Sequence, residues 1–311
     1  MNTSKPNLIE GIYKASSCYV KGRDYTQSPF RYPGGKFYAL KYIIPFLNAY
    51  PHDEYREPFV GGGSVFFGKP KVNHNWLNDL ECDVITTYKA FQDNARSQRI
   101  IDRVGIEIAS RERHAEVRSF TPENEDDVAF RTYYLNRTSY SGIIQKPAWG
   151  YAIGASSPPE NWHRFITGAN RKLADVELTS LDFSEVLSSP ARGRSVLMYL
   201  DPPYFLADQK RAYTKPFEMV DHLRLERMLR SLDHAFLLSY DDCPQIRDLY
   251  SWAHIYEQSW FYNTANSSGP RKIGKELFIT NYKVKPLEQL DLLLDLNKIP
   301  LPVDDLVLLQ T

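Results

Sequence analysis

Short apolar runs alternate along the chain with segments that carry apolar residues at helical spacing. The clearest run is Val196 to Leu200, the pattern of a strand buried on both faces. Residues 40–47 show the spacing of a helix with one apolar face. Comparable strand-like runs cover 72–77, 176–183 and 235–240. This alternation predicts an α/β fold with a doubly wound sheet.

Two stretches depart from the alternation. No strand-like run occurs between 96 and 172, where 96–118 reads as one solvated helix, so an inserted, mainly helical domain is expected. Near the C-terminus, runs at 253–261 and 276–282 flank a glycine-basic loop and predict a closing antiparallel hairpin. The expected organisation is an arm at 1–27, a core domain at 28–95 and 173–283, the insert at 96–172, and an acidic, leucine-rich tail at 284–311.

Composition adds three limits. Hydrophobic residues make up 42% of the 311 residues, enough for a packed core, and the 38 basic and 38 acidic residues balance, so only local charge is informative. Cys18, Cys82 and Cys243 lie too far apart for a disulfide framework or a zinc site. No leader and no long apolar run occurs, so we expect a cytoplasmic protein that does not span a membrane.

Two glycine clusters predict a bound ligand. Gly34-Gly35 precedes a helix and Lys36 adds a cation beside that turn, while the cluster at 61–63 lies at a strand-to-helix turn. Neither is a phosphate loop or a dinucleotide fingerprint. Asp79 lies 18 positions after Gly61, where such folds hold a ribose diol. Packing glycines, a helix-capping role for Asp79, and Asp83 as the ribose partner remain alternatives.

The strand 196–200 runs directly into Asp201-Pro202-Pro203-Tyr204. Asp201 is a hydrogen-bond acceptor, and the two prolines lack an N–H, so this loop is rich in carbonyls and poor in donors. Such a loop suits a substrate that brings N–H groups, and Tyr204 offers a flat face to a planar heterocycle. The alternative is a plain strand exit with a solvated aspartate.

The insert is basic and aromatic between 131 and 172. Six cations, Arg131, Arg137, Lys146, Arg164, Arg171 and Lys172, face the single acid Glu160. Seven rings are interleaved with them: Tyr133, Tyr134, Tyr140, Trp149, Tyr151, Trp162 and Phe165. Arginine and lysine contact phosphates and bases, and rings stack on bases, so this pattern indicates nucleic-acid binding. An ordinary surface over an aromatic core is the alternative.

These elements in this order, Gly-Gly-Lys, Glu57-Pro-Phe-Val-Gly-Gly-Gly-Ser64, the long insert and Asp-Pro-Pro-Tyr, resemble Dam-type (D12 class, alpha group) DNA N6-adenine methyltransferases over roughly residues 28 to 283. The resemblance implies a Rossmann-like S-adenosylmethionine-dependent methyltransferase fold with an inserted target-recognition domain. It also implies transfer of a methyl group from S-adenosylmethionine to N6 of an adenine flipped out of double-stranded DNA, without a metal, in a restriction-modification system or as a solitary enzyme.

The resemblance carries over position by position. Its catalytic residues are Asp201, Pro202 and Tyr204. The positions that meet S-adenosylmethionine are Tyr32, Lys36, Pro58, Phe59, Gly61, Gly63, Ser64, Asp79, Asp182, Phe183 and Asp201. The DNA-binding positions are Arg137, Tyr140, Ser141, Gln145, Lys146, Lys210, Arg211, Arg271 and Lys272.

One departure concerns the DNA target. In the GATC-specific branch a base-reading arginine follows the Asn-Arg-x-x-Tyr-Asn-Gly stretch; here Asn136-Arg137-Thr138-Ser139-Tyr140-Ser141-Gly142 is followed by Gln145 at that place. Because Gln pairs best with adenine and Arg with guanine, we expect a target other than GATC. We also expect a monomer or weak dimer at a prokaryotic nucleoid. If a cognate restriction endonuclease exists, we expect it to cut the same DNA site without contacting this protein.

Two other functions stay open from the sequence. One is methylation of RNA or of a protein amide, but protein glutamine methyltransferases typically have Asn where this chain has Asp201, and they lack the long insert. The other is a DNA-binding protein without catalysis, against which the intact Lys36, Asp79, Asp201 and Tyr204 argue.

Overall fold

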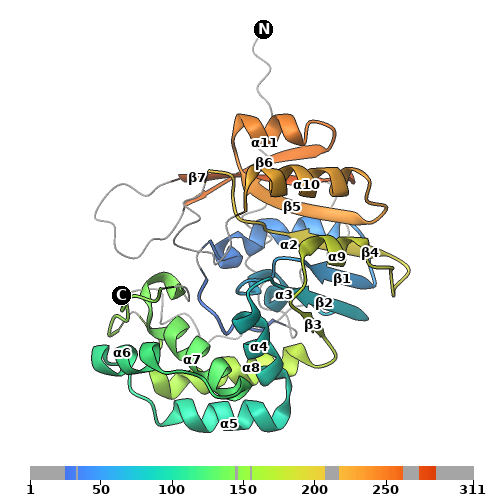
Figure 1. Cartoon of the computed structure of the whole chain (residues 1–311). Helices are drawn as coiled ribbons and strands as arrows, with labels where there is room; N and C mark the ends of the chain where they lie inside the picture. The colour runs from blue at the N-terminus through green and yellow to red at the C-terminus, as the bar shows by residue number, and fades with distance from the viewer. Residues whose placement is uncertain are drawn as a thin grey trace, which may run out of the picture.

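The computed structural model describes residues 25–32, 34–143, 146–154, 156–206, 217–261 and 273–284 (Figure 1). Its centre is a seven-stranded sheet of order β3-β2-β1-β4-β5-β7-β6 in which β7 runs antiparallel to both neighbours and the other pairs are parallel. The strands are β1 (Glu54–Glu57), β2 (His74–Asn78), β3 (Glu177–Thr179), β4 (Val196–Leu200), β5 (Ala235–Asp241), β6 (His254–Phe261) and β7 (Ile273–Thr280). The predicted doubly wound mixed sheet with a closing antiparallel hairpin is confirmed.

Helices cover both faces of the sheet, and a helical group lies beyond its β3 edge (Figure 1). The core helices are η1 (Lys36–Ala39), α2 (Leu40–Asn48), α3 (Ser64–Gly68), α4 (Cys82–Gln92), α9 (Phe183–Ser188), α10 (Met219–Arg230) and α11 (Pro244–Leu249). The inserted helices are α5 (Asn94–Gly105), α6 (Arg111–Ser119), α7 (Glu125–Thr138), η2 (Tyr140–Gly142), η3 (Pro159–Asn161) and α8 (Trp162–Leu173). No described helix is long and apolar enough to cross a membrane.

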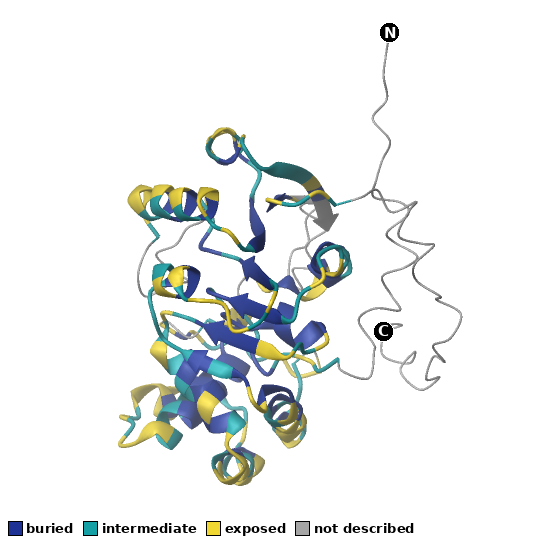
Figure 2. Cartoon of the chain, turned by 90° about the vertical axis from the view of Figure 1, so that its right-hand side faces the viewer, coloured by how far each residue is buried: buried dark blue, intermediate teal, exposed yellow. Residues whose placement is uncertain are grey.

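Strand β4 is buried on both faces, as its apolar sequence predicts. Leu197 and Tyr199 pack into the cluster shared with α2 and the insert, while Val196, Met198 and Leu200 pack into the cluster shared with α9, α10 and α11. Figure 2 shows the middle of the sheet dark blue, and β1, β4 and β5 are buried at all but one position. Because each fully buried apolar side chain stabilises the fold by about 1.5–3 kcal/mol, β4 holds the loop that follows it firmly.

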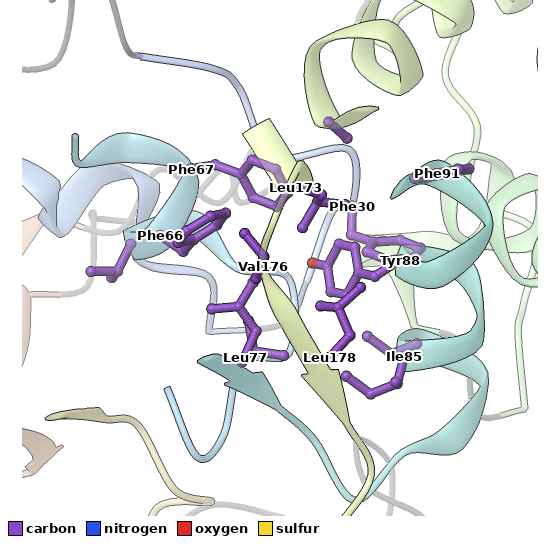
Figure 3. Close-up of a cluster of buried hydrophobic side chains, with 14 of the residues drawn as sticks. Phe30, Phe66, Phe67, Leu77, Ile85, Tyr88, Phe91, Leu173, Val176 and Leu178 are labelled. Atoms are coloured by element: carbon purple, nitrogen blue, oxygen red, sulfur yellow. The ribbon is translucent and has the colours of Figure 1, made fainter. Parts of the chain in front are cut away.

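The insert packs on the core through an aromatic cluster (Figure 3). Phe30, Tyr88 and Phe91 meet there, with ring centres 5.1 Å apart for Phe30 and Tyr88 and 6.4 Å apart for Phe30 and Phe91. Tyr133 of α7 lies 5.3 Å from Phe91. The helices of the insert therefore share one continuous core with α4 and the sheet edge. The domain limits at 96 and 172 stay a prediction.

Residues 96–118 form two helices rather than the one solvated helix that their charge suggested. α5 ends at Gly105, and Ser110 starts α6 by accepting a hydrogen bond from the Arg113 N–H at 3.0 Å. The α5 arginines are paired with the acidic first turn of α7: Arg96 and Arg99 with Asp126, and Arg103 with Asp127. Much of the charge thus joins the helices to each other.

Candidate active site

Asp201, at the carboxyl end of β4, forms an ion pair with Lys36, which lies 165 positions earlier in the sequence. The Lys36 Nζ lies 2.8 Å from Asp201 Oδ2, donates at 3.0 Å to the Gly34 carbonyl, and sits 4.8 Å from the centre of the Tyr204 ring. Burial alone would lower the pKa of Lys36, but attraction to Asp201 and Glu276 raises it above its usual value. The predicted catalytic aspartate therefore already holds an N–H donor beside the predicted stacking ring.

The other oxygen of Asp201 is also oriented. Ser239 of β5 donates to Asp201 Oδ1 at 3.0 Å, and the Tyr199 hydroxyl lies 2.9 Å from the same serine oxygen. The loop beyond is fixed by Asp241, whose two carboxylate oxygens accept from the backbone N–H groups of Phe205 (3.0 Å) and Leu206 (2.8 Å). Hydrogen bonds with two β5 residues, Ser239 and Asp241, thus hold the Asp-Pro-Pro-Tyr loop and the two residues after it.

Tyr204 is held at its hydroxyl as well as by its ring. Its O–H donates to Glu276 Oε2 of β7 at 2.6 Å, and its ring lies 5.9 Å from that of Tyr240 at an angle of 35°. Burial and the nearby carboxylates raise the pKa of Tyr204 well above 10.0, so the hydroxyl keeps its proton. Pro202, between Asp201 and Tyr204, is buried.

The second glycine cluster forms a turn that other residues would strain. Gly61 and Gly63 have φ of 47° and 66°, the left-handed region that favours glycine. The Tyr32 ring lies against this turn: a Cβ built on Gly61 would come within 3.0 Å of it, and one on Gly62 would lie 2.8 Å from Tyr32 Cβ. Ser64 then opens α3. The structure therefore brings the two predicted cofactor motifs together.

Asp79 joins this turn to the next helix. Its Oδ2 accepts from the Gly61 N–H at 2.7 Å and its Oδ1 from the Glu81 N–H at 2.9 Å. Burial raises its pKa to about 6, although both N–H groups oppose that shift and part of its surface still reaches solvent. Glu81, not Asp79, is the N-cap of α4. Since each carboxylate oxygen has two lone pairs, Asp79 keeps acceptor sites for a ligand.

Asp182 and Phe183 begin a helix instead of ending a strand, because β3 stops at Thr179 and Asp182 caps α9 in a capping box with Glu185. The Asp182 carboxylate also pairs with Arg224 at 2.9 Å. The Phe183 ring is buried 5.4 Å from that of Phe59. The Pro58 carbonyl accepts from the Asn78 amide at 3.0 Å. These four predicted cofactor positions therefore lie along one side of the glycine turn, already engaged with one another or with neighbours.

The predicted DNA-contacting residues differ in exposure. Tyr140 is 55% exposed, and Ser141 and Lys146 are exposed with positive φ. Their hairpin is closed by hydrogen bonds from the Tyr140 N–H to Ala148 and from the Gly150 N–H to Thr138. The structure places Arg137 differently: it is 6% exposed, with its guanidinium 4.2 Å from the Phe165 ring centre. Gln145, Lys210, Arg211, Arg271 and Lys272 lie outside the described residues.

Three residues that hydrogen-bond to the segment Asp201–Leu206 were missed by sequence reasoning: Ser239, Asp241 and Glu276. Ser239 and Asp241 are polar residues in the otherwise apolar or aromatic β5, the parallel neighbour of β4, and Glu276 lies in the mixed strand β7. A polar residue at the carboxyl end of the strand beside a catalytic strand is a usable signal. Glu276 gave none on its own, because its role depends on the pairing of β7 with β5.

Comparison with known proteins identifies the relatives of this site. The model of the family D12 class N6 adenine-specific DNA methyltransferase matches residues 32–264. Type II methyltransferase M.CviBI of Paramecium bursaria Chlorella virus NC1A is 27% identical over 264 residues, covering 82% of this chain and 97% of that protein. Type II methyltransferase M1.LlaDCHI of Lactococcus lactis subsp. cremoris is 26% identical, covering 82% and 95%. The DNA N-6-adenine-methyltransferase of Escherichia phage P1 is 28% identical, covering 73% of this chain and 31% of that protein.

Proposed function

This chain belongs to the D12 class N6 adenine-specific DNA methyltransferase family, and we propose that Asp201, Pro202 and Tyr204 are the residues that carry its reaction. The enzyme methylates N6 of adenine in DNA, with S-adenosylmethionine as the methyl donor that the family implies. Of the other functions open from the sequence, neither an inactive DNA-binding protein nor a methylase of RNA or protein amides is favoured by these relatives.

The contact of Lys36 with Asp201 carries the proposal. The Lys36 ammonium donates to Asp201 Oδ2 at 2.8 Å, 4.8 Å from the centre of the Tyr204 ring, so this carboxylate can accept an N–H beside that ring. We infer that the flipped adenine stacks on Tyr204 and gives its N6 hydrogens to Asp201 and to the Pro202 carbonyl. Flipping costs a few kcal/mol, which this stacking helps to offset.

Holding both hydrogens turns the nitrogen lone pair, normally delocalised into the ring, toward the incoming methyl group. S-adenosylmethionine, when bound, supplies an electrophilic methyl on a sulfonium. The new N–C bond would form as the S–C bond breaks, S-adenosylhomocysteine would leave, and the methylated amine would give its surplus proton to Asp201 Oδ2, the oxygen that Lys36 contacts. Ser239 keeps the Asp201 carboxylate in orientation throughout.

The donor site is proposed around the glycine turn. Tyr32, Gly61, Gly63 and Ser64 form its wall, and Asp79 accepts the ribose hydroxyls with its remaining lone pairs. Lys36, Pro58, Phe59, Asp182 and Phe183 complete the predicted set beside Asp201. The fit rests on a turn of glycines, which have no side chains to block a ligand, next to the Asp79 carboxylate, which still has acceptor capacity.

We predict that donor affinity rises with pH through the pKa of Asp79. Its pKa in the folded protein, about 6, lies above the ordinary 3.8, so the free energy of unfolding falls as the pH rises from about 4 to about 6. The same ionisation leaves both carboxylate oxygens as acceptors for the ribose hydroxyls. S-adenosylhomocysteine should bind up to about tenfold more weakly at pH 5 than at pH 7 by calorimetry. Asp79→Asn should bind weakly and show no such pH dependence. Equal slopes in both proteins would remove Asp79 from the donor site.

The exposed hairpin supports a role in DNA binding. Tyr140, Ser141 and Lys146 project from a short, hydrogen-bonded turn beside the catalytic domain. Arg137 at its base supports the hairpin from within in this structure, packed on Phe165. The candidates that lie outside the described residues keep their predicted role as contacts to bases or phosphates: Gln145, Lys210, Arg211, Arg271 and Lys272.

We predict that Lys146→Ala lowers the slope of log affinity against log salt by about one unit without changing the preferred sequence, because it removes one phosphate contact. Tyr140→Ala should instead cost about 1–3 kcal/mol of stacking and relax the sequence preference. Arg227→Ala is the matched control, since Arg227 is exposed on α10, which packs with α9 and α11 and lies away from the insert beyond the β3 edge (Figure 1). Unchanged salt slopes and sites in both hairpin variants would contradict the assignment.

The target is proposed to differ from GATC because of Gln145. Relatives named as Type II methyltransferases support a restriction-modification role. We further propose an endonuclease that acts on the same site without direct contact, and a monomer or weak dimer in the cytoplasm at the nucleoid. The test is incubation with labelled S-adenosylmethionine and unmethylated bacterial DNA, digestion to nucleosides, and mapping of methylated adenines on a plasmid. Absence of labelled N6-methyladenosine would contradict the function; GATC as the sole site would contradict the specificity.

A further inference from the structure

Glu276 is a buried carboxylate that no step above uses. It lies in β7, is 2% exposed, and accepts from the Tyr204 hydroxyl at 2.6 Å. A carboxylate is costly to bury unless donors compensate it. Lys36 lies close enough for Glu276 to contribute to the upward shift of its pKa. Two residues of the proposed reaction centre therefore favour the ionised Glu276: Tyr204 donates a hydrogen bond to it, and the Lys36 ammonium offsets part of its charge.

The sheet explains why Glu276 stands there. In the register of β5 with β7 it lies directly opposite Asp241, and like charges placed so destabilise a sheet. Both carboxylates obtain their donors from the Asp-Pro-Pro-Tyr loop: Asp241 from Phe205 and Leu206, Glu276 from Tyr204. With Ser239 bound to Asp201, the loop is fixed at three successive places.

We propose that Glu276 is a positioning residue for methyl transfer, which fixes the tilt of the Tyr204 ring on which the target adenine stacks. The hydrogen bond from the Tyr204 hydroxyl limits the swing of the whole ring about the Cα–Cβ bond, and Lys36 and Tyr240, whose ring lies at 5.9 Å, limit rotation about the Cβ–Cγ bond. The inference rests on the proposed stacking role of Tyr204. A tilted ring would leave the adenine flipped but misaligned with Asp201, which lowers kcat more than binding.

The test compares Glu276→Leu, which removes the acceptor, with Glu276→Gln, which keeps a carbonyl acceptor without the charge. Glu276→Leu should lower kcat about tenfold to hundredfold with little change in KM for DNA, and Glu276→Gln should recover most of the loss. 2-Aminopurine at the target position should emit more strongly in the Glu276→Leu complex than in wild type, because stacking on Tyr204 quenches it. Tyr204→Phe should reproduce the effect, and adding Glu276→Leu to it should change nothing further.

Glu226→Leu is the matched control. Glu226 is a buried carboxylate that accepts from an aromatic donor, Trp252 Nε1, at 2.8 Å, but it belongs to α10. It should lose stability and keep kcat. Wild-type kcat in Tyr204→Phe, or additive losses in the double variant, would overturn the proposal even if Glu276→Leu failed to fold. Wild-type kcat in Tyr204→Ala would instead overturn the stacking role itself.

Discussion

Asp201→Ala is expected to lower methyl transfer by at least about 10²–10³-fold while DNA and donor binding persist, since one positioned acceptor in a reaction centre is commonly worth that much. The loss exceeds this range if the amine lone pair is never freed from the ring. Asp201 is the residue on which Lys36, Ser239 and the proposed amine converge.

Removing Asp201 also leaves Lys36 without its closest partner, and an unpaired buried charge is destabilising. Asp201→Asn separates the two effects, because its amide keeps an acceptor for Lys36 while offering the amine a weaker one. The free energy of unfolding of Asp201→Asn should be close to that of wild type, but its turnover should be slower. Turnover of Asp201→Ala above half of wild type, in protein shown to be folded, would mean that this loop is not the catalytic centre.

Local sequence was sufficient for the parts of the site that one strand or one turn creates. The apolar run at 196–200 predicts a buried strand, and whatever follows it must emerge at the carboxyl edge of the sheet, so the sequence alone was enough to place Asp201 there. The spacing of Asp79 after Gly61 predicts that both belong to one ligand site, and the structure joins them by a 2.7 Å hydrogen bond, while the ribose-binding role of Asp79 stays a prediction.

Contacts between distant segments could not be read in the same way. Nothing near Lys36 in the sequence indicates that its ammonium binds Asp201, and nothing near Glu276 indicates Tyr204. For the same reason, the number of cations in the insert does not tell how many of them are exposed and able to contact DNA. Arg137 and Lys172 are buried, and Arg131 donates to the Arg118 carbonyl, so three of those six charges serve the fold in the structure.

A buried charged residue that joins distant segments can contribute strongly to the free energy of unfolding. We predict that Arg56→Met is the most destabilising of the changes proposed. Its side chain is fully buried in β1. It donates to Glu54 at 2.7 Å and to the carbonyls of Val186, Ser189 and Pro190 at 2.8 Å. It therefore ties β1 to the segment that leads from α9 into β4.

Breaking a buried ion pair by removing one partner costs about 3–5 kcal/mol, because the remaining charge and acceptors lose their donors. We expect that loss in the free energy of unfolding by urea. Arg192→Ala, which removes an exposed pair with Glu177, should cost no more than about 1 kcal/mol. Replacing Glu54 by Gln in the Arg56→Met background should recover part of the stability, although Glu54 still accepts from the N–H groups of Arg192 and Gly193. A cost for Arg56→Met as small as that of Arg192→Ala would show that the three carbonyls find other donors and that β1 is held by apolar packing alone.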